Sequence, residues 1–155
     1  MRNNNEIDAF FTRFIEKENL DSDTTYFESF HFELSEKLAN ELLDLVLQGK
    51  KRATASSKES FVKTGSKIPK IGDYSIVTDW YNIPKCVIKT TNVQLIPFKD
   101  ITYDICKREG EDDTLQSWQR GHKRFYSEEG KQLGYTFDEN MIVVFEDFEV
   151  VYQED

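Results

Sequence analysis

The stretch Gly49-Lys50-Lys51-Arg52-Ala53-Thr54 opens the most basic part of an otherwise acidic chain. Residues 50–70 contain seven Lys and Arg side chains and one acidic residue, a balance of +6, whereas the whole 155-residue chain has a net charge of −9. The acidic total repels polyanions at long range, which argues against a nonspecific nucleic-acid coat. The basic segment could still hold a phosphate or a small anionic substrate, and the alternative interpretation is a solvated surface loop rich in lysine.

Apolar periodicity predicts helices and strands on both sides of this segment. A helix over residues 7–19, with Asn5 as a candidate N-cap, precedes a second helix that starts at the cap Ser35 and stops near Gly49. The remaining pattern predicts a short strand near 26–32, a hairpin of strands 74–80 and 85–98, helices over 100–108 and 115–133 separated by an acidic loop, and a last strand over 141–152. A mixed α and β fold follows.

Length and composition predict one domain over residues 1–155, in which residues 1–26 form an N-terminal helical extension. An exposed face of Phe10, Phe11 and Phe14 on that extension would indicate assembly. Because the chain contains no apolar run long enough to span a bilayer, we expect no membrane partner. The small number of cysteines favours the cytoplasm and leaves one Cys86–Cys106 bridge open, and the presence of only two histidines argues against a zinc site.

Several short motifs occur together in a recognisable order: Gly49–Thr54 after a helix, Ile71-Gly72-Asp73 before a strand, Glu109-Gly110-Glu111, then Trp118 and His122, and finally Phe145-Glu146-Asp147-Phe148. Over roughly residues 27–152 this arrangement resembles an ASCH domain, and among these it is most similar to the larger bacterial members. The resemblance implies a PUA-like fold, in which a mixed α+β chain builds a β pseudobarrel with surrounding helices. It also implies recognition of RNA or of a modified nucleoside.

Small members of that family act as amidohydrolases on N4-acetylcytidine with a Lys, a Thr and a Glu, which correspond to Lys51, Thr54 and Glu109. In this hypothesis Thr54 attacks the acyl carbon, and Lys51 takes its proton if the cations of Lys50 and Arg52 lower the pKa of Lys51. Those members have an arginine where this chain has Ser56, so a planar, bidentate donor is missing here. Other members are assigned ribonuclease or RNA-binding roles.

Further ligand-binding candidates are Lys50, Arg52, Ser56, Ser57, Trp80, Trp118 and His122. A base could stack on Trp118 and hydrogen-bond to His122, although a Trp at helical spacing is more often part of a core. We expect no cofactor, but a metal-dependent ribonuclease could hold Mg²⁺ or Mn²⁺ on the acidic run from Glu109 to Asp113. A noncatalytic module that binds a protein or a metabolite is the third alternative.

Overall fold

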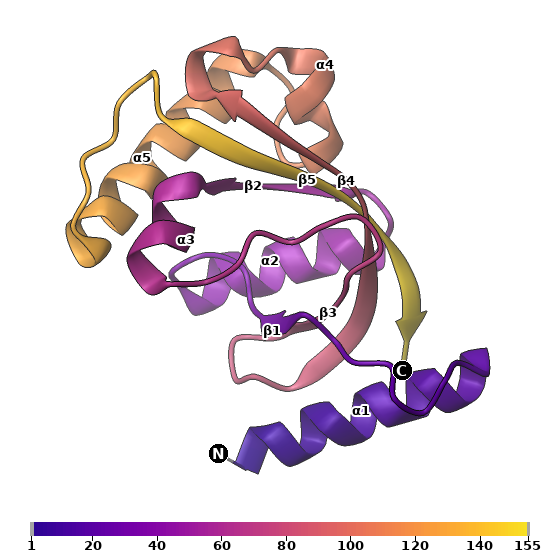
Figure 1. Cartoon of the computed structure of the whole chain (residues 1–155). Coiled ribbons are helices and arrows are strands. Elements are labelled where there is room, and N and C mark those ends of the chain that lie inside the picture. Colours follow the sequence, from indigo (N-terminus) through magenta and orange to yellow (C-terminus); the bar gives the residue numbers. More distant parts are fainter. Residues whose placement is uncertain (1, 155) are drawn as a thin grey trace.

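The computed structural model describes the backbone of residues 2–154 and the side chains of residues 5–154, and it contains one curled, five-stranded sheet with helices on its sides (Figure 1). The strands follow the order β1-β3-β4-β5-β2 across the sheet. Their bounds are β1 Glu28–Phe30, β2 Ala53–Ser57, β3 Tyr74–Thr78, β4 Pro84–Pro97 and β5 Ile142–Gln153. Only the β1–β3 pair is parallel. This half-barrel confirms the expected mixed α+β, PUA-like architecture.

The long strands β4 and β5 form the spine of the sheet, and their pairing runs from Cys86 opposite Gln153 to Pro97 opposite Ile142. Register shifts between Val87 and Ile88 and beyond Thr90 interrupt this ladder, and such irregularities increase the local twist and bend a strand. The predicted β3–β4 hairpin is confirmed. Because the spine curls, its two ends carry separate groups of helices.

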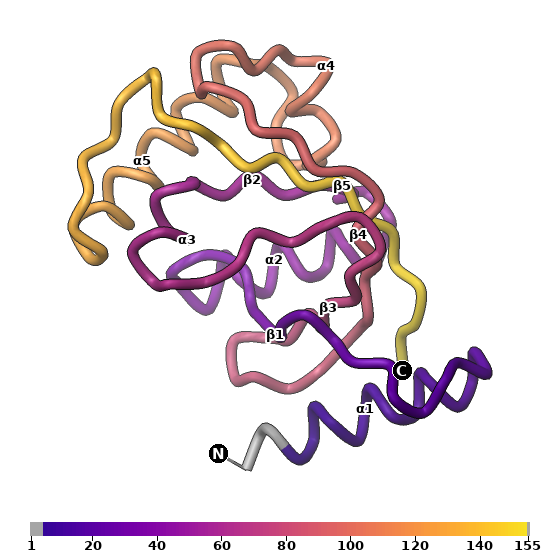
Figure 2. The backbone as a smooth tube through the Cα atoms, in the orientation of Figure 1, coloured from indigo at the N-terminus to yellow at the C-terminus, as the bar shows by residue number. Residues whose placement is uncertain are grey.

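Helix α1, Arg2–Glu18, packs its apolar face against one end of the sheet. Phe10, Phe11 and Phe14 are all buried there, so the exposed apolar face that would have indicated assembly does not exist in this structure. The helix starts before Asn5, and the N-cap prediction was wrong because the polar residues that open the helix carry no apolar periodicity. The end of β5 returns to α1 (Figure 2), where Arg13 pairs with Glu154 at 2.6 Å.

Helices α2, Glu36–Leu47, and α5, Leu115–Leu133, cover the other part of the sheet. The predicted cap of α2 is confirmed, since the Ser35 hydroxyl accepts from the backbone N–H of Leu38. Gly49 has a positive φ of 77° directly after α2, as a helix stop of this kind requires. Helix α5 begins at its cap Thr114 and buries Trp118 and Tyr126 in the core.

Residues 50–70 differ most from expectation, because they contain the strand β2 and the helix α3, Lys58–Thr64, and not a solvated loop. The strand was missed because its inward and outward positions are small Ala, Thr and Ser residues, which produce little hydrophobic contrast. Residues 98–109 form three short helical turns where one helix was expected: η1 Phe98–Asp100, α4 Tyr103–Cys106 and η2 Lys107–Glu109.

Cys86 and Cys106 are both free and buried, so the disulfide bridge that the sequence left open is not formed. No helix in the described part of the chain is long and apolar enough to cross a membrane.

Candidate functional site: a buried ionic cluster beside a cavity

Lys51 is the centre of the candidate site and is almost completely buried, with 1% of its surface exposed. Residues 48–52 join α2 to β2, and both Lys50 and Lys51 donate their backbone N–H to the carbonyl of Leu45. The Lys51 ammonium then donates to the Ala53 carbonyl at 2.8 Å, to Glu109 at 2.8 Å and to Glu111 at 2.5 Å. An ammonium has three N–H donors, so the hydrogen-bonding capacity of Lys51 is used up.

Gly110 explains how two carboxylates reach the same ammonium. Its φ is +71°, and a Cβ built on it would lie 2.2 Å from the carbonyl oxygen of Lys50. No side chain fits at that distance, so only glycine lets the loop lie directly on the Lys50–Lys51 backbone. Glu109 and Glu111 flank this contact and both turn toward Lys51. The Glu-Gly-Glu motif is therefore a close-approach motif between two segments that are far apart in the sequence.

Glu109 joins the ammonium to helix α5. One of its oxygens, Oε1, accepts from the Trp118 indole at 2.7 Å and contacts His122 Nε2 at 2.9 Å, while Oε2 accepts from Lys51. The other ring nitrogen of His122 lies 2.9 Å from the Trp118 carbonyl, which can only accept. Both imidazole nitrogens thus face acceptors, an arrangement that suits the protonated ring. The His122 ring also stacks on Trp118 with centroids 4.1 Å apart.

The pKa values in this cluster are pushed in opposite directions. Burial disfavours the charge on Lys51, but Glu109 and Glu111 outweigh burial and raise the pKa of Lys51. The expectation that Lys50 and Arg52 lower the pKa of Lys51 was therefore wrong, since the groups that dominate are anionic. Burial likewise opposes both charges of the Glu109–His122 pair, yet the pKa of Glu109 is lowered by Lys51 and His122, and that of His122 is raised by Glu109.

Glu111 behaves differently from Glu109. Burial, together with the neighbouring charge of Glu109, raises the pKa of Glu111 to about 7 despite its ion pair with Lys51. Glu109 and Glu111 therefore have pKa values that are shifted in opposite directions. Catalytic sites often contain such a pair, in which one carboxylate stays ionised and the other can take up and release a proton.

A cavity of about 310 Å³ opens beside the cluster. Thr54 of β2 lies at its edge with Lys51, Glu109, Glu111 and His122, so the structure brings the predicted Lys, Thr and Glu together. Its apolar walls come from α2, from α5 and from the loop before α2: Phe32, Leu38, Leu42, Leu45 and Phe125. The volume and the mixture of apolar walls with a few polar groups are typical of small-molecule sites.

The other sequence candidates divide into residues near the cavity and residues away from it. Ser56 lines a second, adjoining cavity of about 320 Å³. Ser57 is buried and caps α3 while donating to Glu129 at 2.7 Å, so its hydroxyl is used structurally. Lys50 and Arg52 are exposed and line neither cavity, and Trp80 lies against His31 with centroids 4.8 Å apart.

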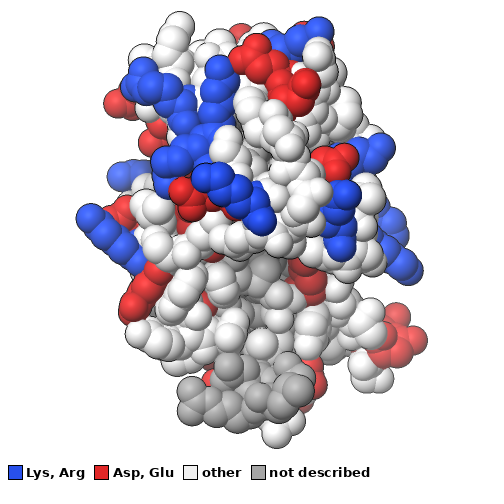
Figure 3. Space-filling model, turned by 90° about the vertical axis from the view of Figure 1, so that its left-hand side faces the viewer, with Lys and Arg blue, Asp and Glu red and all other residues white. Residues whose placement is uncertain are grey.

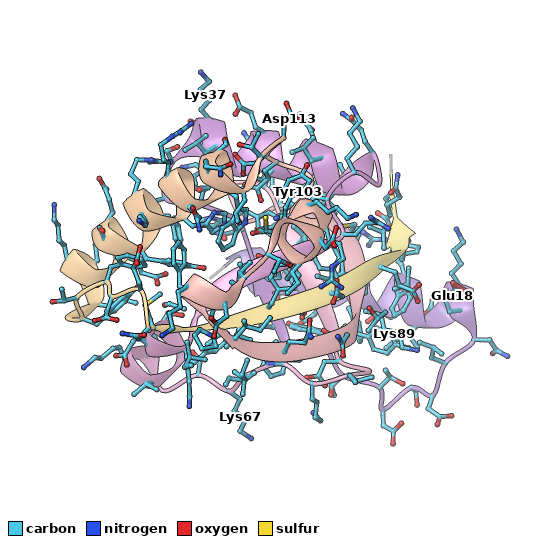
Figure 4. The ribbon with its side chains drawn as sticks, turned by 90° about the horizontal axis from the view of Figure 1, so that it is seen from above. Glu18, Lys37, Lys67, Lys89, Tyr103 and Asp113 are labelled. Atoms are coloured by element: carbon cyan, nitrogen blue, oxygen red, sulfur yellow. The ribbon has the colours of Figure 1, made fainter. Side chains whose placement is uncertain are left out.

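The basic side chains lie mainly on outer surfaces. On the face that Figure 3 shows, Lys and Arg side chains gather in the upper half with acidic side chains among them. Seen from above, Lys37 of α2 and Asp113 before α5 lie on one side of the molecule and Lys67 lies on the opposite side (Figure 4). Of the lysines in residues 50–70, Lys51 is therefore the one found among the described lining residues of the 310 Å³ cavity.

Sequence reasoning missed Phe32, Phe125 and Arg124 as lining residues, and it considered Glu111 only as part of an acidic run. The Glu-Gly-Glu spacing was the available signal for Glu111. Phe32 lies over the Lys51 ammonium, 5.3 Å from nitrogen to ring centroid. Nothing in the local pattern around Phe32 or Phe125 distinguishes a cavity wall from a core position.

The acidic run from Glu109 to Asp113 is not gathered around one point. Glu109 and Glu111 are paired with cations, and Asp112 accepts from Ser117 at the start of α5 at 2.6 Å. Within residues 2–154, no three His, Cys, Asp or Glu side chains are placed to hold one metal ion. Asp112 is thus placed beside the N-terminus of α5, where the helix dipole favours a negative charge.

Comparison with known proteins agrees with this geometry. The family model of the ASCH domain matches residues 28–152. The chain is similar to the crystal structure of an ASCH domain from Lactobacillus crispatus JV V101, at 32% identity over 94% of each chain and a TM-score of 0.84. It is also similar to a protein of Enterococcus faecalis V583, at 31% identity over 95% of this chain and 88% of that one, with a TM-score of 0.86. No match was found among proteins of curated function.

The curled sheet, the covering helices and the cavity beside α5 thus define a PUA-like module of the kind associated with RNA binding. The chain belongs to the ASCH domain family.

Proposed function

We propose that the 310 Å³ cavity binds a nucleobase, either as part of RNA or as a modified nucleoside. The observation that carries the proposal is the pairing of aromatic walls with a fixed ionic cluster in one concave site. Phe32 and Phe125 provide faces on which a planar base can stack. Membership of a PUA-like family associated with RNA supports the same class of ligand.

The polar groups that remain for a ligand are few and well defined. The Lys51 ammonium has no N–H left for a ligand, and Glu109 already accepts from Lys51, Trp118 and His122. The Thr54 hydroxyl has no hydrogen-bonding partner within the described residues, and Glu111 keeps 18% of its side chain exposed. We therefore expect Thr54 and Glu111 to form hydrogen bonds with the polar edge of the base. Lys51, which is itself held by Glu109, keeps Glu111 in position through their ion pair.

Hydrolysis of an acylated nucleoside is the second candidate function. It is favoured by the position of Thr54 beside Glu109 and Glu111, whose pKa values are shifted in opposite directions. The Thr54 oxygen would attack the acyl carbon, and its proton would pass to a base and then to the leaving amine; water would release the acyl group from Thr54. Lys51 is poorly placed as that base, because its pKa is raised and its N–H groups are engaged. Glu111, with a pKa of about 7, is the better suited group.

Mass spectrometry of N4-acetylcytidine and of a short single-stranded RNA, each incubated with the protein, separates these functions. Deacetylation by the wild type but not by Thr54→Ala or Glu111→Gln would support the hydrolase, and Ser127→Ala on the exposed face of α5 is the control. RNA cleavage that requires added Mn²⁺ would support the ribonuclease instead.

Binding is tested in parallel by calorimetry with the same two ligands. If a ligand binds but is not chemically altered, the result would support recognition and not hydrolysis as the function. Failure of both to bind, for wild-type protein shown to be folded, would contradict the proposal and favour a module for a protein or another metabolite.

A further inference from the structure

The second cavity is the continuation of the first. The two share Phe32, Glu33, Thr54, Ala55 and Phe125, so they form one cleft that passes along β2 from Lys51 toward α3. Phe32 and Phe125 stand at the junction. Together the two halves have room for a ligand larger than a base, and the second half has no role in the site described above.

We propose that this cleft selects a nucleoside without phosphate, with the base beside Lys51 and the sugar hydroxyls in the second half; this rests on the proposed function and narrows its ligand. The first argument is charge. The second half is lined by the carboxylates of Glu28, Glu33, Glu129 and Glu146 and by His31, and no Lys or Arg side chain is among its described lining residues. A phosphate placed there would face several carboxylates at short range in a partly desolvated site, which strongly disfavours it.

The first half does not compensate for this charge. Its lining contains Lys51, Arg124 and His122, against Glu33, Glu41, Glu109, Glu111 and Asp112. Lys51 pairs with Glu109 and Glu111, and His122 pairs with Glu109, which leaves Arg124 as the only other Lys or Arg among the described lining residues and Glu33, Glu41 and Asp112 as further carboxylates. Lys67 and Lys70 line a separate hollow that shares only Glu28 and Ser66 with the second half.

The second argument is hydrogen bonding. Sugar hydroxyls are donors, and carboxylates and hydroxyls are suitable acceptors for them. Glu129 accepts from Ser57 and from Tyr135 through one oxygen, Oε1, each at 2.7 Å, so its other oxygen can accept from a ligand. Ser56 and Ser60 add hydroxyls to the same wall. Glu146 is mostly buried there, and burial raises its pKa to about 7, so its share of the charge repulsion is reduced near neutral pH; its Oε2 already accepts from the Thr90 hydroxyl at 2.7 Å.

Calorimetry with N4-acetylcytidine, its 5′-monophosphate and a short single-stranded RNA that contains the same base tests this selectivity. We expect the nucleoside to bind at least tenfold more tightly than the monophosphate. Glu28→Gln and Glu129→Gln remove carboxylates from the second half and should reduce that ratio severalfold. Glu128→Gln, next in sequence but lining neither half, should leave the ratio unchanged.

The outcomes separate the two proposals. Binding of the monophosphate or the RNA as tightly as the nucleoside would overturn the selectivity and leave the proposed function intact. An unchanged ratio in both Glu28→Gln and Glu129→Gln, with each variant shown to be folded by its thermal unfolding, would also overturn it. If none of the three probes binds, the proposed function fails and this inference fails with it.

Discussion

The two ends of the sheet differ in whether charged side chains are buried together with the apolar ones. Beneath α1, Phe10 and Phe14 pack on Ile76 and Val87, and the cluster is apolar and aromatic. Beside α5, an apolar cluster that includes Trp118 borders a buried group of ionisable side chains: Lys51, Glu109, Glu111 and His122. The first arrangement stabilises the fold directly by removing apolar surface from water. In the second, the cost of taking charges out of water can exceed their mutual attraction.

This difference indicates where the molecule is built for stability and where it is built for function. A protein in which well-packed apolar side chains replace a buried ion pair is often at least as stable as the original. The charged cluster also borders a cavity, whereas the α1 residues line neither half of the cleft. We therefore interpret the cluster as the part of the fold that presents chemistry to a ligand.

The largest expected effect comes from removing the central cation. Lys51→Met leaves Glu109 and Glu111 buried without an ammonium, and we expect a loss of about 3–5 kcal/mol in the free energy of unfolding at pH 7. Urea denaturation measures it. Adding Glu109→Gln and Glu111→Gln to the same chain should restore much of the loss; a triple variant no more stable than Lys51→Met would contradict the account of the cluster.

A smaller loss is expected from Gly110→Ala. The added Cβ would clash with the Lys50 carbonyl, and the positive φ is unfavourable for alanine. We therefore expect the free energy of unfolding to fall by about 2–3 kcal/mol. Gly72→Ala is a matched control, since Gly72 also has a positive φ but a Cβ there meets nothing within 4 Å. Equal losses in the two variants would show that backbone conformation alone matters, and that the close approach to Lys50 does not.

At the end of the sheet covered by α1, Phe14→Leu should lower the free energy of unfolding by about 1–2 kcal/mol, because the smaller side chain repacks imperfectly. Because Phe14 lies far from the cleft in the fold, the affinity for the nucleoside should not change when it is measured below the unfolding transition. A severalfold change in affinity would show that the two ends of the sheet are coupled and would break the comparison drawn above.

The last expected effect is a change of stability with pH in the unmodified chain. The pKa values of Glu111 and His122 are both raised by folding, so their contributions to stability are present at low pH and decrease as pH rises. Glu146 acts in the same direction. For Glu111 the decrease runs from about pH 4.5 to about pH 7, a window that already includes the opposing effect of its ion pair with Lys51.

Thermal unfolding followed from pH 5 to pH 8 measures this decrease. Glu111→Gln should flatten it, whereas Phe14→Leu should retain the slope of the wild type. A wild-type stability that rises over this range would contradict the direction of these pKa shifts.

Much of the fold could be predicted from the sequence because its long elements have strong periodicity, as in α5 and the β3–β4 hairpin. Strand β2 could not, since Ala53–Ser57 gains its strand character from pairing with β5, a contact distant in sequence. The meeting of Lys51, Thr54 and Glu109 was expected from family resemblance. The pKa of Lys51 was not predictable from its neighbours in sequence, because the charges that control it come from the Glu109–Glu111 loop.

Strand β2 lies at one edge of the sheet, and its free carbonyls are occupied by side chains. The Ala53 carbonyl accepts from Lys51 at 2.8 Å and the Ala55 carbonyl accepts from the Tyr126 hydroxyl at 2.9 Å. An exposed edge is a template on which another strand can add, and natural proteins block such edges. Lys51 therefore also protects the chain against edge-to-edge aggregation, and a peptide partner could not extend the sheet at β2 without first displacing it.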